Sequence, residues 1–259
     1  MTTKENNYES ESIIVSDGCC VQYGDTLAID DVTFSIKKGK KIAVVGPNGG
    51  GKSTLFKALA GLIPLSSGSL KIDGLDPLNA KSMISYIPQK DSINWNFQLS
   101  VKQVVEMGLT DKKTLFMSND KSNQEKINES LNQVGIPDKS EENINNLSGG
   151  QQQRVLLAKA LIQDSNILLL DEAFSAIDVG AQEDIMKIIN GSDLKEKTIL
   201  LATHDVNNLE NRFDEVLCLN RHCCAFGDPL KVLTEEVIKE MYGSHNDMFL
   251  NHKPGKHGI

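Results

Sequence analysis

The chain has 259 residues, of which 39% are hydrophobic and 24% charged, a composition typical of a protein that folds around a sizeable core. With 27 Lys and Arg against 35 Asp and Glu, its net charge is −8, which argues against broad attraction to nucleic acid or to an anionic membrane surface. Residues 1–12 are polar and acidic, unlike a secretory signal, and no run approaches the roughly 20 apolar residues that span a bilayer. The sequence therefore predicts a cytoplasmic protein that has no nucleic acid partner.

The two ends of the chain differ from its middle. Residues 1–11 are predicted to be disordered, and the polar tail at residues 244–259, which contains proline and glycine, is predicted to be flexible. The tail histidines His245, His252 and His257 are interpreted as solvated side chains rather than metal ligands. The folded domain is therefore expected to span residues 12–243.

Strand patterns dominate the start of this domain. Alternating apolar residues at Val32, Phe34 and Ile36 predict a half-buried strand, and residues 41–45 predict a more fully buried one. Apolar residues at helical spacing then predict a helix over residues 53–62. The order is strand, glycine-rich loop, helix.

Helical spacing replaces the strand pattern further along, and strands and helices then alternate. Residues 100–135 read as a helical insert, within a helical subdomain expected at about residues 90–160. The later elements are a helix to residue 163, a strand at 167–170, a helix near 182–189 and a strand at 198–202. This alternation predicts an α/β fold with a parallel sheet flanked by helices.

The cysteines form no C-x-x-C pair, and the two vicinal pairs lie in strand-like, apolar sequence, so all five are interpreted as reduced thiols. They are Cys19, Cys20, Cys218, Cys223 and Cys224. A metal site built from His222, Cys223 and Cys224 is the alternative. Packing in the core is favoured because adjacent strand residues point to opposite faces.

A phosphate-binding loop is predicted between the buried strand and the first helix, where GPNGGGKS matches G-x-x-x-x-G-K-[ST]. In such a loop, backbone N–H groups and the helix N-terminus surround phosphate oxygens, the lysine reaches the β and γ phosphates, and the serine binds Mg²⁺. The residues predicted to bind ATP here are Gly46, Pro47, Asn48, Gly49, Gly50, Gly51, Lys52, Ser53 and Thr54.

Two acidic residues end the strand at 167–170, at the edge where open α/β sheets bind ligands. Asp171 fits a partner of Mg²⁺, and Glu172 fits a general base that activates water for attack on the γ phosphate. Together with the phosphate loop, these acids predict ATP hydrolysis.

A second glycine-rich turn opens a helix at Leu147 to Gln151 and offers further anion-binding groups. No second lysine follows it, so it is not expected to hold a nucleotide of its own. A second copy of the chain, arranged head to tail, would place this turn over the ATP of its partner. The residues concerned are Ser148, Gly149, Gly150 and Gln151.

These motifs resemble those of ATP-binding-cassette (ABC) ATPases, the P-loop NTPase subunits of ABC transporters, over residues 12–243. The matching segments appear in the family's order: Walker A as above, Gln89 after Tyr86-Ile-Pro as the Q-loop, LSGGQQQR as the signature, ILLLDE as Walker B, SAID ending at Asp178 as the D-loop, and His204 as the switch histidine. The resemblance implies an N-terminal antiparallel β subdomain and an inserted α-helical subdomain. Ala173 departs from the proline that is usual after the catalytic glutamate.

The resemblance also implies roles for single residues. Tyr23 would stack on adenine, Gln89 would link Mg²⁺ and water to the helical insert, and His204 would contact the γ phosphate. Catalysis is then assigned to Glu172, His204, Gln89 and Lys52, and Mg²⁺ binding to Ser53, Gln89 and Asp171.

The segment after the Q-loop and the sequence RH...AFGDP near the end are similar to ATPases of the manganese, zinc and iron importer group. Asn94 and Gln98 depart from that group's usual acidic residue and proline. The implied partners are a membrane permease and, indirectly, an extracytoplasmic metal-binding protein, with this chain at the cytoplasmic face of the membrane as a peripheral protein. An ABC motor for another solute and a soluble ABC ATPase that acts outside transport are the alternatives.

Trp95 and Phe97 stand out as large apolar residues in a polar stretch without helical or strand period. One interpretation is that they pack the insert against the sheet. The other is that they anchor a helix of the permease.

Overall fold

The structure is a computed structural model that describes residues 12–89, 93, 95, 98–109, 121–172, 178–191 and 194–243. The chain divides into two compact units: the first unit comprises residues 1–81 and 198–259, and the second unit residues 82–197.

An antiparallel sheet opens the first unit. Its strands are β1 (Ser12–Tyr23), β2 (Thr26–Lys37) and β4 (Ser67–Ile72), in the order β2-β1-β4. The inward-facing residues of β2 are buried and the residues between them exposed, which confirms the half-buried strand expected there.

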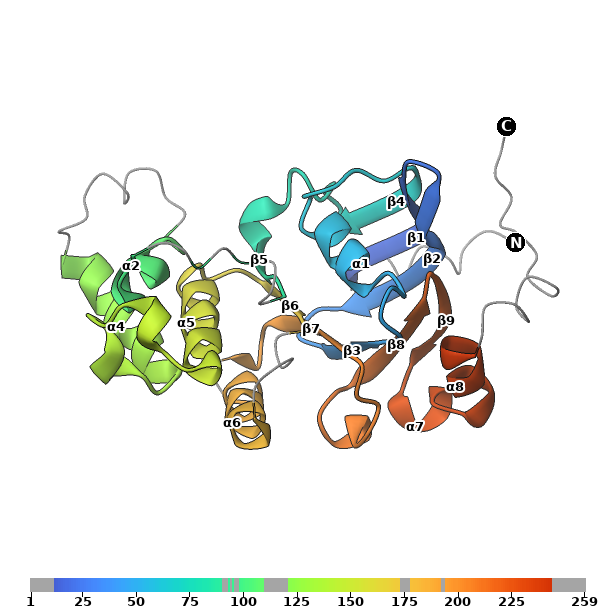
Figure 1. Cartoon of the computed structure of the whole chain (residues 1–259). Coiled ribbons are helices and arrows are strands. Elements are labelled where there is room, and N and C mark those ends of the chain that lie inside the picture. Colours follow the sequence, from blue (N-terminus) through green and yellow to red (C-terminus); the bar gives the residue numbers. More distant parts are fainter. Residues whose placement is uncertain are drawn as a thin grey trace. The chain divides into compact units, whose positions relative to one another are not determined.

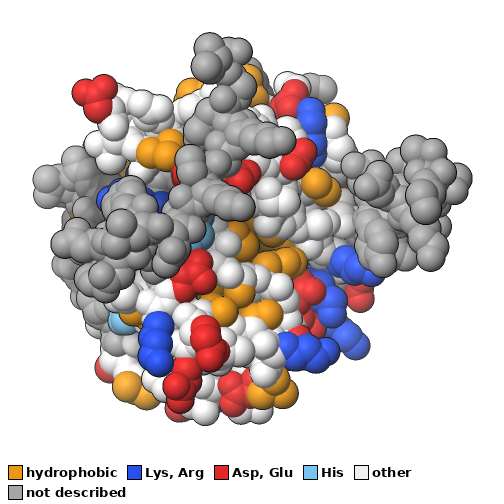
Figure 2. Space-filling model, turned by 90° about the vertical axis from the view of Figure 1, so that its right-hand side faces the viewer, with side chains coloured by type: hydrophobic (Ala, Val, Ile, Leu, Met, Phe, Trp, Pro, Cys, Tyr) orange, Lys and Arg blue, Asp and Glu red, His pale blue; other side chains and the backbone are white. Residues whose placement is uncertain are grey.

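A mostly parallel sheet forms the rest of the first unit, in the order β7-β3-β8-β9. Strand β3 (Lys41–Val45) is parallel to β7 (Thr198–Thr203) and β8 (Glu215–Asn220), whereas β9 (His222–Gly227) is antiparallel to β8. Helix α1 (Lys52–Leu59) contacts β2, and α7 (Pro229–Val232) and α8 (Glu235–Tyr242) contact β8 and β9 (Figure 1). Figure 2, seen from the side of α8, shows acidic and basic side chains interspersed around small hydrophobic areas.

The second unit combines a parallel strand pair with a group of helices. Strands β5 (Ile84–Ile87) and β6 (Ile167–Asp171) are parallel, with Ile87 opposite Leu170. Helices α2 (Val101–Glu106), α4 (Lys121–Gln133) and α5 (Gly149–Ile162) pack on one another, and α6 (Val179–Ile189) contacts α5 (Figure 1). Short 3-10 turns lie at Lys81–Met83, Pro137–Lys139 and Ile144–Asn146, and one at Leu209–Asn211 belongs to the first unit.

Each unit has its own hydrophobic core. In the first unit, Ile42, Val44 and Phe56 are fully buried. In the second unit, Ile127 and Leu131 are fully buried among the helices. Burial of this kind supplies the main favourable term in folding, so each unit carries the apolar contacts that stabilise it.

The α/β fold with an N-terminal antiparallel sheet and a helical insert is confirmed, and several boundaries differ from the sequence prediction. Helix α1 begins one residue earlier and ends at Leu59, because Gly61 turns the chain with φ +63°. Strand β6 continues to Asp171, which is buried. Helix α6 begins at Val179, because the Asp178 carboxylate accepts a hydrogen bond from the Ala181 amide and caps it. Among the described residues, no helix is both long enough and apolar enough to span a membrane.

Candidate functional site

The glycine-rich loop leads from β3 directly into α1, in the strand–loop–helix order that a phosphate loop requires. Gly51, the residue before the helix, has φ +96°, and a Cβ there would lie 2.8 Å from the carbonyl oxygen of Ala28. Only glycine takes this conformation in this space at little cost. The loop therefore turns sharply enough for the first amides of α1 to point to its mouth.

Lys52 braces the loop from inside. The residue is only 4% exposed. Its ammonium donates hydrogen bonds to the carbonyl oxygens of Gly46 (2.8 Å) and Pro47 (3.0 Å). A buried cation beside converging helix amides gives the loop a positive potential. The loop is therefore built to attract an anion such as a phosphate group.

The β8–β9 connection supports the loop from behind. The Arg221 amide donates a hydrogen bond to the Gly50 carbonyl at 2.8 Å. A Cβ on Gly46 would collide with the carbonyl oxygen of Leu219 at the end of β8. The loop thus lies directly against the neighbouring strand, and that contact leaves no room for a side chain at Gly46.

His204 emerges beside this loop. Strands β3 and β7 are parallel with Val45 opposite Thr203, so Gly46 and His204 leave adjacent strands at the same edge of the sheet. The His204 side chain is exposed, and its carbonyl oxygen accepts a hydrogen bond from the Tyr242 hydroxyl at 3.2 Å. The structure therefore puts the predicted switch histidine at the edge that carries the phosphate loop.

Tyr23 ends β1 and is 49% exposed. Its ring is accessible to solvent, and stacking on an adenine base requires such an exposed ring.

In the second unit, β5 and β6 bring Gln89 and Glu172 together. The Gln89 Nε2 donates a hydrogen bond to the Glu172 Oε2 at 3.0 Å. Glu172 has φ +47°, in the left-handed region that non-glycine residues rarely adopt. Such strained residues concentrate at functional sites, so the backbone of Glu172 supports a functional role for its carboxylate.

No sequence motif assigns a role to Tyr86, yet the Tyr86 side chain holds Asp171. The Tyr86 hydroxyl donates a hydrogen bond to the Asp171 Oδ2 at 3.0 Å, and Asp171 is 1% exposed. Burial, together with the neighbouring Asp171 carboxylate, raises the pKa of Tyr86, so the phenol keeps its proton and remains a donor. The position of Tyr86 in β5, the strand next to β6, could have indicated this contact. Identifying the contact requires the register of the two strands.

The second glycine-rich turn is a helix N-terminus. Ser148 caps α5: its Oγ accepts a hydrogen bond from the Gln151 amide at 3.3 Å, while the Gln151 Oε1 accepts one from the Ser148 amide at 2.9 Å. Gly149 and Gly150 form the first turn, whose amides have no acceptor within the helix itself. The turn can therefore present N–H groups to an anion.

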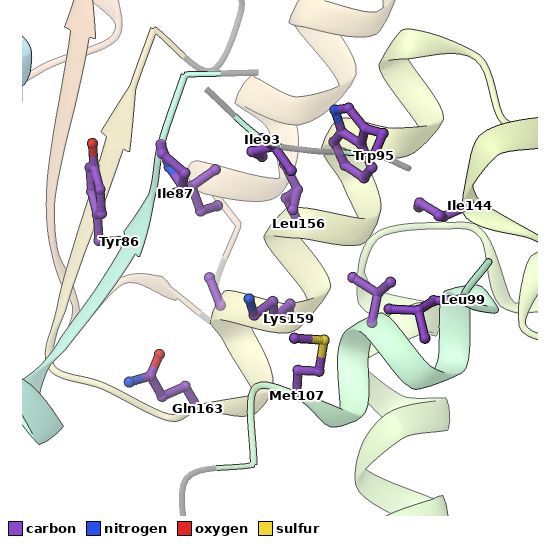
Figure 3. A pocket seen from close by; sticks show the side chains of 13 residues that line it. Tyr86, Ile87, Ile93, Trp95, Leu99, Met107, Ile144, Leu156, Lys159 and Gln163 are labelled. Atoms are coloured by element: carbon purple, nitrogen blue, oxygen red, sulfur yellow. The ribbon is translucent and has the colours of Figure 1, made fainter. Parts of the chain in front are cut away.

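A cavity of about 280 Å³ lies in the second unit, beside the segment that follows Gln89. Trp95, Met107 and Leu156 line it from different elements and face the same space (Figure 3). The Trp95 Nε1 is buried and has no hydrogen-bond acceptor among the described residues. Burial lowers the pKa of Lys159, which lies on the same wall. The cavity is mostly apolar but carries one unused donor and one cation.

The predicted residues are divided between the two units. Lys52 and the rest of the phosphate loop, Ser53, Thr54 and His204 belong to the first unit, as does Tyr23. Gln89, Asp171, Glu172 and the turn at 148–151 belong to the second unit. Phe97, Asn94, Ala173 and the D-loop residues before Asp178 lie outside the described residues.

Comparison with known proteins agrees with this geometry. Residues 29–175 match the family described as ABC transporter. The manganese transport system ATP-binding protein MntB of Bacillus subtilis is 37% identical over 227 residues, which are 88% of this chain and 91% of that protein. The zinc transport system ATP-binding protein TroB of Treponema pallidum is 34% identical over 88% of this chain and 85% of its own length.

Solved structures give the same fold. CbiO1 from Clostridium perfringens, part of the ABC transporter complex cbiONQ, aligns with a TM-score of 0.75 and 26% identity, covering 89% of this chain and 94% of that one. An ATP-binding cassette of an ABC transporter aligns with a TM-score of 0.78 at 22% identity, covering 90% of this chain and 99% of that one, a likeness of fold alone.

Proposed function

This chain belongs to the ABC transporter family, and we propose that it is the ATP-binding and ATP-hydrolysing subunit of a transporter that imports a divalent transition metal, namely manganese, zinc or iron, through a separate permease. The phosphate loop braced by Lys52 is the observation that carries the ATPase assignment. The metal cargo is supported by relatives named for manganese and zinc transport.

ATP binds through groups that the first unit provides. The amides of the loop from Gly46 to Gly51 and of Ser53 and Thr54 surround the phosphates, Lys52 neutralises the β and γ phosphates, and Tyr23 stacks on adenine. Lys52 then exchanges its bonds to the loop carbonyls for bonds to phosphate oxygens, which are stronger because both partners are charged.

The donor set fits magnesium, which prefers oxygen ligands. Asp171 offers a carboxylate that is buried and held by Tyr86, and Ser53 and Gln89 add a hydroxyl and an amide oxygen. Bound there, magnesium would neutralise charge on the phosphates.

Hydrolysis depends on the acid and amide pair of the second unit. Glu172 accepts a proton from water as the water oxygen attacks the γ phosphorus, and the bond to ADP breaks. Gln89, hydrogen-bonded to Glu172, orients the carboxylate and the water. His204 donates a hydrogen bond to the γ phosphate. The products are ADP and phosphate.

The active state is a dimer with a second copy. The capped turn at Ser148, with Gly149, Gly150 and Gln151, binds the γ phosphate of the ATP held by the partner copy. Each ATP is then sandwiched between two chains, and the two-fold symmetry gives two equivalent sites.

The permease docks at the cavity lined by Trp95. This segment continues directly from Gln89, so a change at the γ phosphate has a short route to the docked partner. An apolar wall with an unused indole N–H and the Lys159 ammonium suits an amphipathic helix that brings a carbonyl or carboxylate. The subunit is thereby held as a peripheral protein at the cytoplasmic face, and the permease receives metal from an extracytoplasmic binding protein.

Glu172→Gln tests this function in vesicles that hold the complete transporter. We expect the variant to bind ATP with nearly unchanged affinity, to lose at least 100-fold in turnover, and to take up no manganese, zinc or iron. Because ATP stays bound, the purified variant should also elute as a dimer with ATP. Glu183→Gln, an exposed acid on α6, is the matched control and should behave as wild type.

Two results would overturn parts of the proposal. Turnover near that of wild type in Glu172→Gln would remove Glu172 as the base. ATP-driven uptake of another solute, with none of the three metals, would leave the ATPase in place but reject the metal cargo.

A further inference from the structure

Three side chains whose chemistry suits metal binding converge where β9 packs against α8. The His222 Nε2 lies 3.6 Å from the Cys224 Sγ and 2.8 Å from the Glu240 Oε1, and the three ligand atoms all lie within 4.8 Å of one another. His222 and Cys224 belong to β9 and Glu240 to α8, two elements of the first unit that pack together. None of the three belongs to the phosphate loop, to the Gln89–Glu172 pair or to the cavity lined by Trp95.

One of the three separations equals that of a tetrahedral zinc site, and a second is shorter. In a tetrahedral zinc site, with Zn–S about 2.3 Å and Zn–N about 2.1 Å, the sulfur and nitrogen ligands are about 3.6 Å apart, as found for Cys224 and His222. Nitrogen and carboxylate oxygen would be about 3.4 Å apart, so the Glu240 side chain must retreat by about half an ångström. That side chain is 44% exposed and can make this shift.

Local structure aims these side chains at one another. The register shifts between the pairs Cys218–Ala225 and Leu219–Cys223, which leaves Cys224 between two rungs as a β-bulge. Bulges redirect side chains and are common next to functional sites. The backbone beside Glu240 is restrained because the buried Asn220 Nδ2 donates a hydrogen bond to the carbonyl of Met241 at 2.9 Å, and Met241 is fully buried.

We propose that His222, Cys224 and Glu240 form a binding site for a thiophilic divalent cation, with zinc as the best match and water as the fourth ligand. One thiolate, one imidazole and one carboxylate suit zinc, cobalt or ferrous iron, whereas magnesium and calcium prefer oxygen ligands alone. The sequence pattern favoured packing of these cysteines in the core, because the adjacent residues Cys223 and Cys224 of a regular strand point to opposite faces. It had no means of bringing in Glu240, 16 residues further on.

The site is joined to the nucleotide-binding groups at both ends. Arg221, the residue before His222, donates its amide hydrogen to the Gly50 carbonyl of the phosphate loop. Tyr242, two residues after Glu240, donates its hydroxyl hydrogen to the His204 carbonyl at 3.2 Å. A cation that clamps β9 to α8 therefore restrains two segments that touch the loop and the switch histidine. This coupling rests on the proposed function, and it makes the motor responsive to the metal level on its own side of the membrane.

Cobalt binding to the full-length chain in reducing buffer tests the site, because a cobalt–thiolate bond gives a strong near-ultraviolet absorption. Wild type should show this band, and zinc should displace it. Cys224→Ser should abolish the band, and Glu240→Gln should weaken cobalt and zinc binding by 10-fold or more. Cys223→Ser is the matched control and should keep the cobalt band and the wild-type affinity for cobalt and zinc, since the Cys223 thiol is outside the cluster. All variants retain the tail histidines and the other cysteines.

Two results with these variants would refute the proposed metal site. An unchanged cobalt band in Cys224→Ser, or unchanged zinc affinity in Glu240→Gln, would overturn the site, because Glu240 lies at the surface and its replacement leaves the core intact. Far-ultraviolet circular dichroism of each variant checks that it is folded.

Coupling is tested by the affinity for ATP with and without zinc. We expect about a fivefold change in wild type, at the lower end of known coupling between sites, and none in Glu240→Gln, which also corrects for zinc that binds ATP in solution. Equal changes in both proteins would overturn the coupling and leave the site standing. Failure of the chain to bind ATP in the absence of zinc would instead count against the proposed function.

Discussion

Replacing Tyr86 with phenylalanine removes one hydrogen-bond donor and keeps the ring. The lost bond joins the Tyr86 hydroxyl to the Asp171 Oδ2 at 3.0 Å, and Asp171 is 1% exposed, so water cannot replace the donor without rearrangement. Hydrogen bonds to charged groups contribute about 1.5–3 kcal/mol to stability. We therefore expect Tyr86→Phe to lower the free energy of unfolding by about 2 kcal/mol, roughly 30-fold in the folding equilibrium.

Urea unfolding followed by tryptophan fluorescence measures this loss directly. The chain has one tryptophan, Trp95, and it lies in the same unit as Tyr86. The matched control is Tyr242→Phe, which removes a hydroxyl from a residue 42% exposed, bonded to the neutral carbonyl of His204. Because Tyr242 belongs to the first unit, unfolding of this control is followed by far-ultraviolet circular dichroism, and it should lose less than about 1 kcal/mol. Equal midpoints for wild type and Tyr86→Phe would refute the claim that this bond holds Asp171.

The difference between wild type and Tyr86→Phe also depends on pH. Burial raises the folded-state pKa of Tyr86 above the value of about 10 that a phenol has in an unfolded chain. The stability that the protonated phenol contributes is thus complete below pH 10 and is lost as the pH rises toward the folded-state value. We expect a constant difference from pH 7 to 9 that shrinks above pH 10.

Two further substitutions test the loop and the docking cavity. Gly46→Ala puts a methyl group against the Leu219 carbonyl and should lower stability by about 2–3 kcal/mol and ATP affinity at least tenfold, measured by unfolding and fluorescent ATP titration. Gly74→Ala, with φ +75° and open space around its Cβ, should lose only the 1–2 kcal/mol of left-handed backbone strain and keep its ATP affinity. Trp95→Ala should leave ATP binding intact but weaken permease association about 30-fold, on the order of 2 kcal/mol. Replacement of the exposed Leu230 by alanine should change neither ATP binding nor permease association. Unfolding of Trp95→Ala would assign the indole to the core instead.

The features that could be predicted from the sequence are those whose residues lie close together along the chain. Strand β3, the glycine loop and α1 follow one another without a gap, so the phosphate loop could be identified from a single stretch. The α/β class followed in the same way, from alternating strands and helices. The cap at Ser148 was also within reach, since the serine and Gln151 lie three residues apart.

Contacts between distant residues could not be predicted from spacing. Tyr86 meets Asp171 across 85 positions, and their meeting depends on the register of β5 and β6. Glu240 reaches His222 only because α8 packs on β9. Both contacts depend on how helices and strands pack, and neither Tyr86 nor Glu240 belongs to a sequence motif that would mark it.

The β8–β9 turn connects one of these contacts, that between His222 and Glu240, to the phosphate loop. Arg221 has φ +64°, a costly conformation for a residue with a side chain, and its amide and carbonyl are both used: the amide donates to Gly50, and the carbonyl accepts from the Asp30 amide at 2.7 Å. Strain of this kind persists where the surroundings fix the backbone on both sides. The turn is therefore hydrogen-bonded both to β2 and to the phosphate loop, and we expect a change imposed on His222, the next residue, to reach Gly50 through the Arg221 amide.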